Sequence, residues 1–484
     1  MQTGRFACSI QEKEQPAMEV KWYTAGLLAA VAVFSGTSLL VFHHVYALQP
    51  TPFIDEAFHI PQCQQFCAGN YTQWDPKITT LPGLYLLSVG LLGYLSGLEP
   101  PSCTVYLLRM VNLLFSVITL VVIYSILKVL NTEESREWRH LVTSLTLASF
   151  PVLYTFSFLY YTDVASTLCV LLMYSLHLHR QPGTAACIGA VAVLVRQTNV
   201  IWVGVLAALA CSDFMVSTLA ASKSAGRRKT VDPCSPRIVR DVLHFYSAHM
   251  KKDPLNFAEA LTDVLYEGVQ YVLVCVGFAA FVVWNGGLVV GDRSAHEAVL
   301  NAPQLLYFLA TAAGFLAPLT LEYADEMWRS LRRRPLLWAG VAAALALLLQ
   351  SAGPAHPYLL ADNRHLAFYA WRRWLGHPSR RLALVPVSLA ALCLMAAGGA
   401  RRPLLQRAVL AAGAVAALVP QRLLEFRYFI LPFLLLRLHL RPPGALACLA
   451  ECALYAMVNA ATLYLFTVKT FTWEDQPGLQ RIIW

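Results

Sequence analysis

Long apolar runs alternate with short polar breaks along most of this chain. A helix needs about 20 apolar residues to cross a bilayer, and this pattern predicts roughly 11 to 13 membrane-spanning helices. The predicted spans are residues 25–48, 104–130, 141–158, 164–179, 185–195, 200–216, 268–290, 305–322, 336–351, 382–397, 404–419, 429–439 and 445–468. Residues 81–97 form one further apolar run, but Pro82 and several glycines fit a juxtamembrane helix equally well.

The composition indicates the same fold class. Of the 484 residues, 57% are hydrophobic and only 13% are charged, and the mean hydropathy is +0.53. Soluble domains are far less apolar. No polar break is long enough for a soluble domain, so we expect an all-α polytopic membrane protein. It would have a cytosolic tail over residues 1–23 and a single transmembrane unit over residues 24–484.

Two basic loops explain the net charge of +9. One is residues 217–263, and the other includes Arg329 and residues 332–334. Both are predicted to be cytosolic, because lysine and arginine accumulate in loops on that side. The loops lack the interleaved aromatic residues of a nucleic-acid surface, so we expect contact with membrane lipids and no nucleic-acid partner.

The polar segment 49–80 follows the first predicted span, which has no preceding apolar signal sequence and is therefore an uncleaved anchor. With a cytosolic N-terminus, this span places the segment in the lumen. The segment contains Asn70-Tyr71-Thr72, a sequon that is modified only on the luminal side. We therefore expect residues 49–103 to be the first luminal loop.

The 12 cysteines are scattered, mostly within apolar runs, where they act as small hydrophobic residues. No C-x-x-C repeat indicates a zinc site. Cys63, Cys67 and Cys103 would share the oxidising lumen, where one disulfide can form among them.

The first of four polar clusters contains the adjacent carboxylates Asp55 and Glu56, with His59, Trp74 and Asp75 in the same segment. On a helix Asp55 and His59 would share a face. Acidic loop residues are usually only solvated, but a carboxylate beside a membrane is costly and is kept where it meets a substrate, a proton or an ion. Two readings stay open: a general base beside an acceptor hydroxyl, or a Mg²⁺ or Mn²⁺ site that includes Asp75.

The second cluster, Arg196-Gln197-Thr198-Asn199, interrupts an apolar stretch. A buried arginine needs an anionic partner. That partner is either a carboxylate or carbonyl of the protein or a bound phosphate, which matches the guanidinium fork.

The third and fourth clusters also lie at predicted membrane boundaries. The third comprises residues 291–296, with His296, and residues 356–365, with Asp362, Arg364 and His365. Its mixture of hydrogen-bonding groups and nearby aromatic rings is typical of sites for sugars and phosphates. In the fourth, residues 420–428, Glu425 and Arg427 either pair with each other, extend to the interface or hold a lipid phosphate.

Several of these strings resemble the dolichyl-phosphate-glucose α-1,2-glucosyltransferases of the endoplasmic reticulum. The resemblance covers about residues 24–484, and Asp163 stands where that family often has glutamate. It is carried by residues 55–62, 73–85, 196–199, 356–365, 420–428 and the ending at 469–473.

The resemblance implies a GT-C type glycosyltransferase of the endoplasmic reticulum membrane, with a luminal active site and juxtamembrane helices in the first loop. Its substrates would be dolichyl phosphate glucose and a dolichyl-diphosphate-linked oligosaccharide with two glucoses. A β-linked donor and an α-linked product require one inversion. No cofactor or metal would be required.

Within this resemblance, Asp55 is predicted to be the base and Glu56 to orient the acceptor or tune Asp55. The donor phosphate is predicted to bind Arg364, Arg427 and Arg196. The predicted substrate-binding residues are His59, Trp74, Asp75, Gln197, His296, Asp362, His365 and Glu425.

Two alternatives belong to other classes. A non-catalytic multipass regulator of an ion channel would use the polar clusters as an interface. A secondary transporter would use Asp55 as a proton or ion site and would be built from inverted repeats, of which the sequence shows none.

Overall fold

The computed structural model describes residues 17–97, 101–132, 136–225, 231–252, 254–292, 299–351, 353, 355–474 and 478–484. Nearly all regular structure in these ranges is helical, which confirms the predicted all-α class. The helices of the first half are α1 (Ala17–Leu48), α2 (Glu56–Cys67), α3 (Gly83–Ser96), α4 (Val105–Leu130), α5 (Glu137–Ala148), α6 (Pro151–Phe156), α7 (Thr162–Leu178), α8 (Pro182–Val195), η1 (Gln197–Asn199), α9 (Val200–Ala225), α10 (Arg237–Lys252) and α11 (Pro254–Asn285).

The second half has shorter and more irregular elements. They are α12 (Gln304–Phe315), α13 (Ala317–Glu322), α14 (Ala324–Arg333), α15 (Pro335–Gln350), α16 (Pro357–Ala361), α17 (Leu366–Ala370), η2 (Trp371–Leu375), α18 (Pro378–Arg381), α19 (Leu384–Gly398), α20 (Leu404–Leu418), η3 (Phe426–Phe429), α21 (Ile430–Leu438), α22 (Ala445–Val468), β1 (Phe471–Thr472) and β2 (Leu479–Gln480). The two strands pair antiparallel as one small hairpin.

Within the described residues, six helices are long and apolar enough to cross a bilayer. They are Thr24–Leu48, Val105–Leu130, Gln197–Ser224, Phe257–Asn285, Pro378–Gly398 and Ala445–Val468. Six shorter apolar helices of 10 to 17 residues accompany them. The chain is therefore a polytopic membrane protein.

Two runs predicted as single spans are broken by proline. Residues 141–158 divide into α5 and α6, with Pro151 at the start of α6, and residues 305–322 divide into α12 and α13, with Pro318 at the start of α13. Proline lacks a backbone donor and clashes with the preceding turn, so it begins a helix but does not continue one. Hydropathy alone does not predict where proline divides an apolar run into two helices.

The first helix extends beyond the predicted span, which agrees with the apolar segment Thr24–Leu48. Residues 17–23, expected to be part of the tail, belong to α1. The sequence has Pro16 directly before this stretch and no glycine until Gly26, so nothing in it opposes helix formation.

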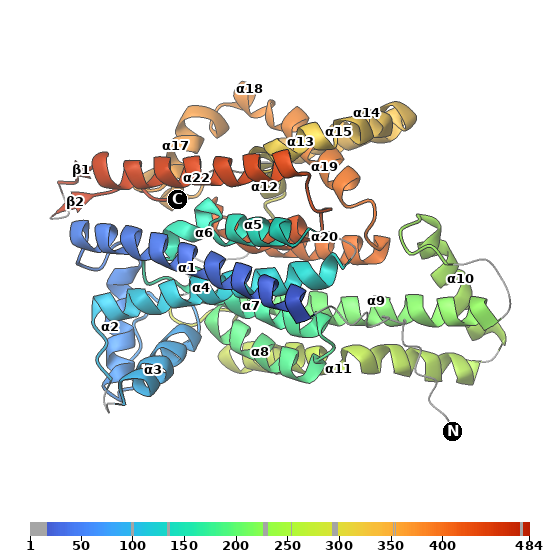
Figure 1. Cartoon of the computed structure of the whole chain (residues 1–484), viewed down its shortest axis with the longest axis horizontal. Helices are drawn as coiled ribbons and strands as arrows, with labels where there is room; N and C mark the ends of the chain where they lie inside the picture. The colour runs from blue at the N-terminus through green and yellow to red at the C-terminus, as the bar shows by residue number, and fades with distance from the viewer. Residues whose placement is uncertain are drawn as a thin grey trace.

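Most of the long helices run along the long axis of the molecule (Figure 1). The strand pair and the helices α2 and α3 lie at one end, and the basic helix α10 lies at the other. Both α2 and α3 are too short to span a bilayer. They pack against each other, and α3 also packs on α8. A side chain at Gly83 would collide with the backbone of Leu194 and Val195, so glycine permits this close approach.

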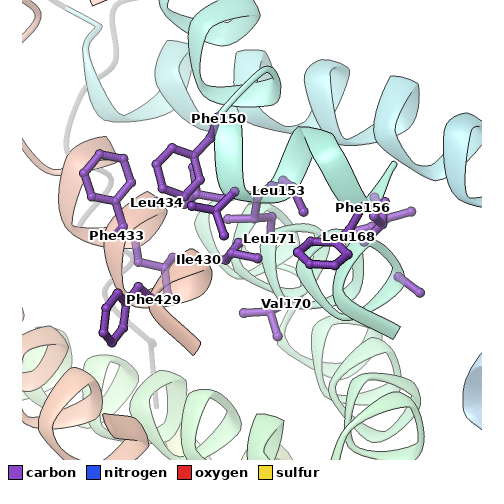
Figure 2. Close-up of a cluster of buried hydrophobic side chains, with 14 of the residues drawn as sticks. Phe150, Leu153, Phe156, Leu168, Val170, Leu171, Phe429, Ile430, Phe433 and Leu434 are labelled. Carbon is purple, nitrogen blue, oxygen red and sulfur yellow. The ribbon is translucent and has the colours of Figure 1, made fainter. Parts of the chain in front are cut away.

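A hydrophobic cluster joins residues 150–171, in the first half of the chain, to residues 429–434 in its C-terminal part (Figure 2). Phe150 of the α5–α6 turn stacks on Phe433 of α21, with ring centroids 4.5 Å apart. Phe156 and Phe429 belong to the same core and are fully buried. This packing fixes η3 against α6, and the polar residues just before Phe429 depend on it for their position.

Cys67, at the end of α2, forms a disulfide with Cys103, just before α4. This confirms a disulfide within the first loop, while Cys63 remains a buried free thiol. The bridge closes a loop of 36 residues that contains all of α3.

We predict that replacing Cys67 and Cys103 together by serine lowers the free energy of unfolding by about 3 to 4 kcal/mol, because a loop of this length regains its entropy in the unfolded chain. Thermal unfolding in detergent measures the change. The matched control is Cys187→Ser, which alters an exposed free thiol. Equal unfolding temperatures for the double variant and the control would contradict the prediction.

Candidate active site

A cavity of about 850 Å³ opens at the end of the bundle where α1 and α22 end. Its walls come from four segments that are far apart in sequence: residues 48–58, 358–367, 423–427 and 478–484. Six of the predicted site residues line it: Asp55, Asp362, Arg364, His365, Glu425 and Arg427. The structure thus brings together the first, third and fourth polar clusters.

Asp55 lies at the N-terminal boundary of α2 and projects into the cavity. Its side chain is 37% exposed. Its Oδ2 accepts a hydrogen bond from Nη1 of Arg427 at 3.0 Å. Its Oδ1 accepts no hydrogen bond from the described part of the chain, so this oxygen is open to a ligand.

Glu56 points the opposite way, into the protein. Its carboxylate forms a bidentate pair with Arg109 of α4, with Oε1 2.8 Å from Nε and Oε2 2.6 Å from Nη2. The backbone amides of Phe53 and Tyr160 also donate to it. Both charged side chains are fully buried. Glu56 therefore does not reach the cavity, and the expectation that it orients the acceptor lacks the required geometry.

Arg109 also holds the polypeptide that leads to Asp55. Its Nη1 donates to the carbonyl of Gln49 at 2.6 Å and its Nη2 to that of Thr51 at 3.0 Å. Sequence reasoning missed this residue. The available signal was a positive charge inside the apolar run 104–130, which requires an anionic partner.

The residue before Asp55 is in a strained conformation. Ile54 has a φ of +52°, which is rare for a β-branched residue. The phenol of Tyr161 bonds to both sides of it, accepting from the amide of Asp55 and donating to the carbonyl of Phe53. Strain of this kind persists where the surroundings determine the backbone, and it concentrates at functional sites. Here it sets the direction of the Asp55 side chain.

Arg427 is the centre of a chain of alternating charges. Besides Asp55, it pairs with Glu425 at 2.9 Å and lies 3.6 Å from Asp163. Asp163 in turn pairs with Arg196. Arg196 does not line the cavity, so its partner is a carboxylate of the protein, one of the two readings left open by the sequence. The guanidinium of Arg427 also lies over the ring of Tyr161.

This arrangement decides the protonation state of Asp55. Burial opposes ionisation, but the charge of Arg427, with contributions from His59 and His365, outweighs it and holds the pKa of Asp55 below its ordinary value of 3.8. Burial alone would lower the pKa of Arg427. The surrounding carboxylates outweigh this effect and raise that pKa well above its ordinary value. The two groups therefore face a ligand as an ion pair.

A second ion pair lies on another wall. Asp362 accepts from Arg364 through both oxygens, at 2.9 and 2.7 Å. Burial again opposes ionisation, but these hydrogen bonds and the charge of His365 keep the pKa of Asp362 low. The Arg364 guanidinium also lies over the ring of Trp473, 4.5 Å from its centroid.

The C-terminal segment completes this wall. The amide of Ile483 donates to the carbonyl of Arg364, and Nδ1 of His365 lies 2.9 Å from the carbonyl oxygen of Trp484. The ring of Trp484 packs against Phe426, which directly precedes Arg427.

Four other predicted residues are in the described structure but do not line the cavity. His59 contacts the phenol of Tyr85 at 2.6 Å, and its pKa is lowered, mainly by burial. The indole of Trp74 donates to a loop carbonyl, and Asp75 accepts from the amide of Lys77. Gln197 donates to the carbonyl of Thr79. These contacts shape the first loop.

The remaining predicted residue, His296, lies outside the described residues.

A Mg²⁺ or Mn²⁺ site in the first loop would need the carboxylates of Asp55, Glu56 and Asp75 to lie close together. Glu56 is instead bound to Arg109, and Asp75 is engaged with its own loop. Among the residues that the structure describes, no three His, Cys, Asp or Glu side chains are grouped to hold a metal ion.

Comparisons with known proteins identify the family of the chain. Residues 49–438 match the DIE2/ALG10 family. The chain belongs to this family. A Mus musculus relative is 37% identical over 96% of this chain and 99% of its own length. A Homo sapiens relative is 35% identical over 94% and 98%, and an Arabidopsis thaliana relative is 32% identical over 95% and 100%.

All three relatives carry the name Dol-P-Glc:Glc(2)Man(9)GlcNAc(2)-PP-Dol alpha-1,2-glucosyltransferase. Neither the regulator nor the transporter alternative gains support from them. No solved structure matches the chain, so the GT-C type arrangement stays a prediction from the sequence resemblance.

We predict that Arg109→Gln lowers the free energy of unfolding by about 3 to 5 kcal/mol, because it leaves the buried carboxylate of Glu56 without its partner. The double variant Glu56→Gln with Arg109→Gln should lose less, since no unpaired charge stays buried. Thermal unfolding in detergent measures both. The control is Arg329→Gln, which removes an exposed arginine 4.0 Å from Glu326. A double variant less stable than the single one would contradict this account.

Proposed function

We propose that this protein transfers glucose from dolichyl phosphate glucose to the 2-hydroxyl of the terminal glucose of Glc2Man9GlcNAc2 diphosphate dolichol, forming an α-1,2 bond. The observation that carries the proposal is an ionised, partly exposed Asp55 in a cavity that also holds paired arginines, in a chain of the DIE2/ALG10 family. The relatives named for this reaction match nearly the whole chain.

The bonds involved define the role of Asp55. The donor is β-linked and the product is α-linked, so one in-line displacement at C1 gives the inverted product. Oδ1 of Asp55 accepts the proton of the acceptor hydroxyl as that oxygen attacks C1. Arg427 holds Oδ2, which keeps the carboxylate ionised and aimed.

The cavity also offers surfaces for the sugar. Phe58 and Tyr358 line it and can stack on pyranose faces. The carboxylates of Glu425 and Asp362 and the imidazole of His365 lie at the same cavity and supply hydrogen-bonding groups for sugar hydroxyls. We assign Arg364 to the donor phosphate, because it lines the cavity and its Nη1 makes only a 3.4 Å contact with Gln480.

The location follows from the lipid substrates. A multi-pass protein that uses two dolichol-linked substrates acts in the endoplasmic reticulum membrane, and we propose that the cavity faces the lumen. The first loop, with its Cys67–Cys103 disulfide, forms one wall, and a disulfide fits an oxidising compartment. The basic helix α10 lies at the opposite end of the bundle, as expected for the cytosolic side (Figure 1).

We predict that Asp55→Asn lowers the rate of glucosyl transfer by roughly 10² to 10⁴-fold, because an amide cannot accept the proton. The assay uses purified protein with dolichyl phosphate glucose and the diglucosylated lipid-linked acceptor. The matched control, Asp241→Asn, changes a carboxylate on α10 and should keep full activity. A wild-type protein that transfers no glucose would overturn the proposed function.

The same assay with EDTA tests the metal reading. We expect full activity, since two of the three carboxylates that a metal would need, Glu56 and Asp75, are engaged within the protein. Loss of activity that Mg²⁺ or Mn²⁺ restores would contradict this expectation.

The pH profile tests the link between Asp55 and Arg427. The base works when ionised, and its pKa is lowered, so the midpoint of the loss of activity through its protonation should lie below pH 3.8 in the wild type. In Arg427→Gln the charge that lowers the pKa of Asp55 is gone and burial remains, so the acid limb of the activity profile should move to higher pH. Measuring kcat/KM from pH 4 to 8 checks the shift, with Arg329→Gln as control. An unmoved limb in a folded Arg427→Gln protein would disprove the link.

A further inference from the structure

Arg481, in the C-terminal segment, also lines the cavity and differs from the other cavity arginines. It is only 4% exposed. Arg364 pairs with Asp362, and Arg427 is surrounded by three carboxylates. Arg481 forms no ion pair with any residue that the structure describes. It was not among the residues predicted from the sequence.

The contacts of Arg481 fix its orientation. Nη2 donates to the carbonyl of Leu48 at 3.0 Å, and Nε lies 3.4 Å from Oε1 of Gln49. Nη1 donates to the carbonyls of Phe466 and Thr467 at 3.0 and 3.4 Å. These are backbone groups at the C-terminal ends of α1 and α22, plus one neutral side chain. A guanidinium has five N–H donors, so one N–H of Nη2 is left for a ligand.

The partners of Arg481 only partly compensate its charge. Helix C-termini carry about half a negative charge each, spread over the last four carbonyls, and Arg481 bonds to only one of these carbonyls in α1 and two in α22. A phosphate, in contrast, supplies a full charge and oxygens that match the guanidinium fork. Arg481 is therefore held in place by neutral groups, with its electrostatic attraction available to an anion in the cavity.

The helices that hold Arg481 are exposed to lipid. In the most apolar 18-residue stretch of α1, and likewise of α22, only 22% is buried inside the protein. Their C-terminal ends lie close enough together for one guanidinium to bond to both. A lipid phosphate has its chain in the bilayer and its charge at the membrane surface. The end of these two helices, where Arg481 lies, is the place in the cavity that matches such a ligand.

We propose that Arg481 binds the phosphate of the lipid-phosphate donor, and this inference rests on the proposed function. It divides the cavity by charge. Around Asp55, two cavity-lining carboxylates surround one arginine, Arg427. Arg481 itself carries a positive charge without a carboxylate partner among the described residues. Arg364 lies nearby, because it contacts Gln480, the residue before Arg481. The acceptor hydroxyl binds at the first end and the donor phosphate at the second.

The reaction uses this polarity. The bond between C1 of glucose and the phosphate oxygen breaks, and its electron pair stays on that oxygen. The bond between the acceptor oxygen and C1 forms, and the acceptor proton goes to Asp55. The leaving dolichyl phosphate gains one negative charge, which Arg481 stabilises. Arg427, already shared among Asp55, Glu425 and Asp163, acts on the base instead.

The test compares Arg481→Gln with the wild type in steady-state transfer, varying donor and acceptor separately, with dolichyl phosphate as product inhibitor. We expect the KM for the donor and the inhibition constant of dolichyl phosphate to rise together by roughly 10 to 100-fold, the range of one charged hydrogen-bonded contact. The KM for the acceptor should stay within about twofold. A residue that only joins α1 to α22 would lower stability without this selective shift.

Other outcomes are equally informative. An unchanged donor KM and inhibition constant in a folded Arg481→Gln protein overturn the inference. An increase in the acceptor KM alone also overturns it, because the anion would then be the diphosphate of the acceptor. If Arg481→Gln does not fold, Arg481→Lys serves instead. Lysine keeps the charge but lacks the fork, so the inhibition constant should rise at least about threefold, and an unchanged value overturns the inference. A wild type without transfer refutes the proposed function itself.

Discussion

The buried ion pair between Glu56 and Arg109 is the interaction on which the rest of the site depends. Removing two charges from water costs several kcal/mol per ion, and a pair recovers this only with good geometry and further hydrogen bonds. Here both conditions hold: the pair is bidentate, and each partner makes additional bonds to the backbone of the first loop or its neighbour. An apolar replacement could fill the same space, but it would not hold the chain that leads to Asp55.

This constraint explains how a strained backbone persists beside the base. Glu56 binds the amide of Phe53, Arg109 binds the carbonyl of Thr51, and Tyr161 bonds on both sides of Ile54. The loop is fixed at each end, so Ile54 has little freedom to relax. Asp55 and Glu56 are adjacent, yet one faces the cavity and the other the protein interior. Their division of labour follows from this geometry and not from any difference in chemistry.

The sequence was sufficient for the fold class and for most of the polar clusters. Apolar runs identify helices, and Asp55, Arg364 and Arg427 were found because polar residues at a membrane boundary require an explanation. It was insufficient where one residue overrides a pattern or where partners are remote. Pro151 divides a run that hydropathy reads as continuous. The partner of Arg109 lies 53 residues away, and Asp55, one of the partners of Arg427, lies 372 residues away, so no local pattern could assign these two pairs.

The position of Arg481 has a consequence for biosynthesis. Its contacts join residue 481 to residues 48 and 49 across 433 and 432 positions of sequence, almost the full length of the chain. The segment that forms this wall of the cavity is therefore synthesised after all of the helices described above. Until residues 478–484 have been made, the cavity has its base, Asp55, but lacks the C-terminal wall. Contacts between residues so far apart in sequence form slowly, so this part of the cavity is expected to be completed late in folding.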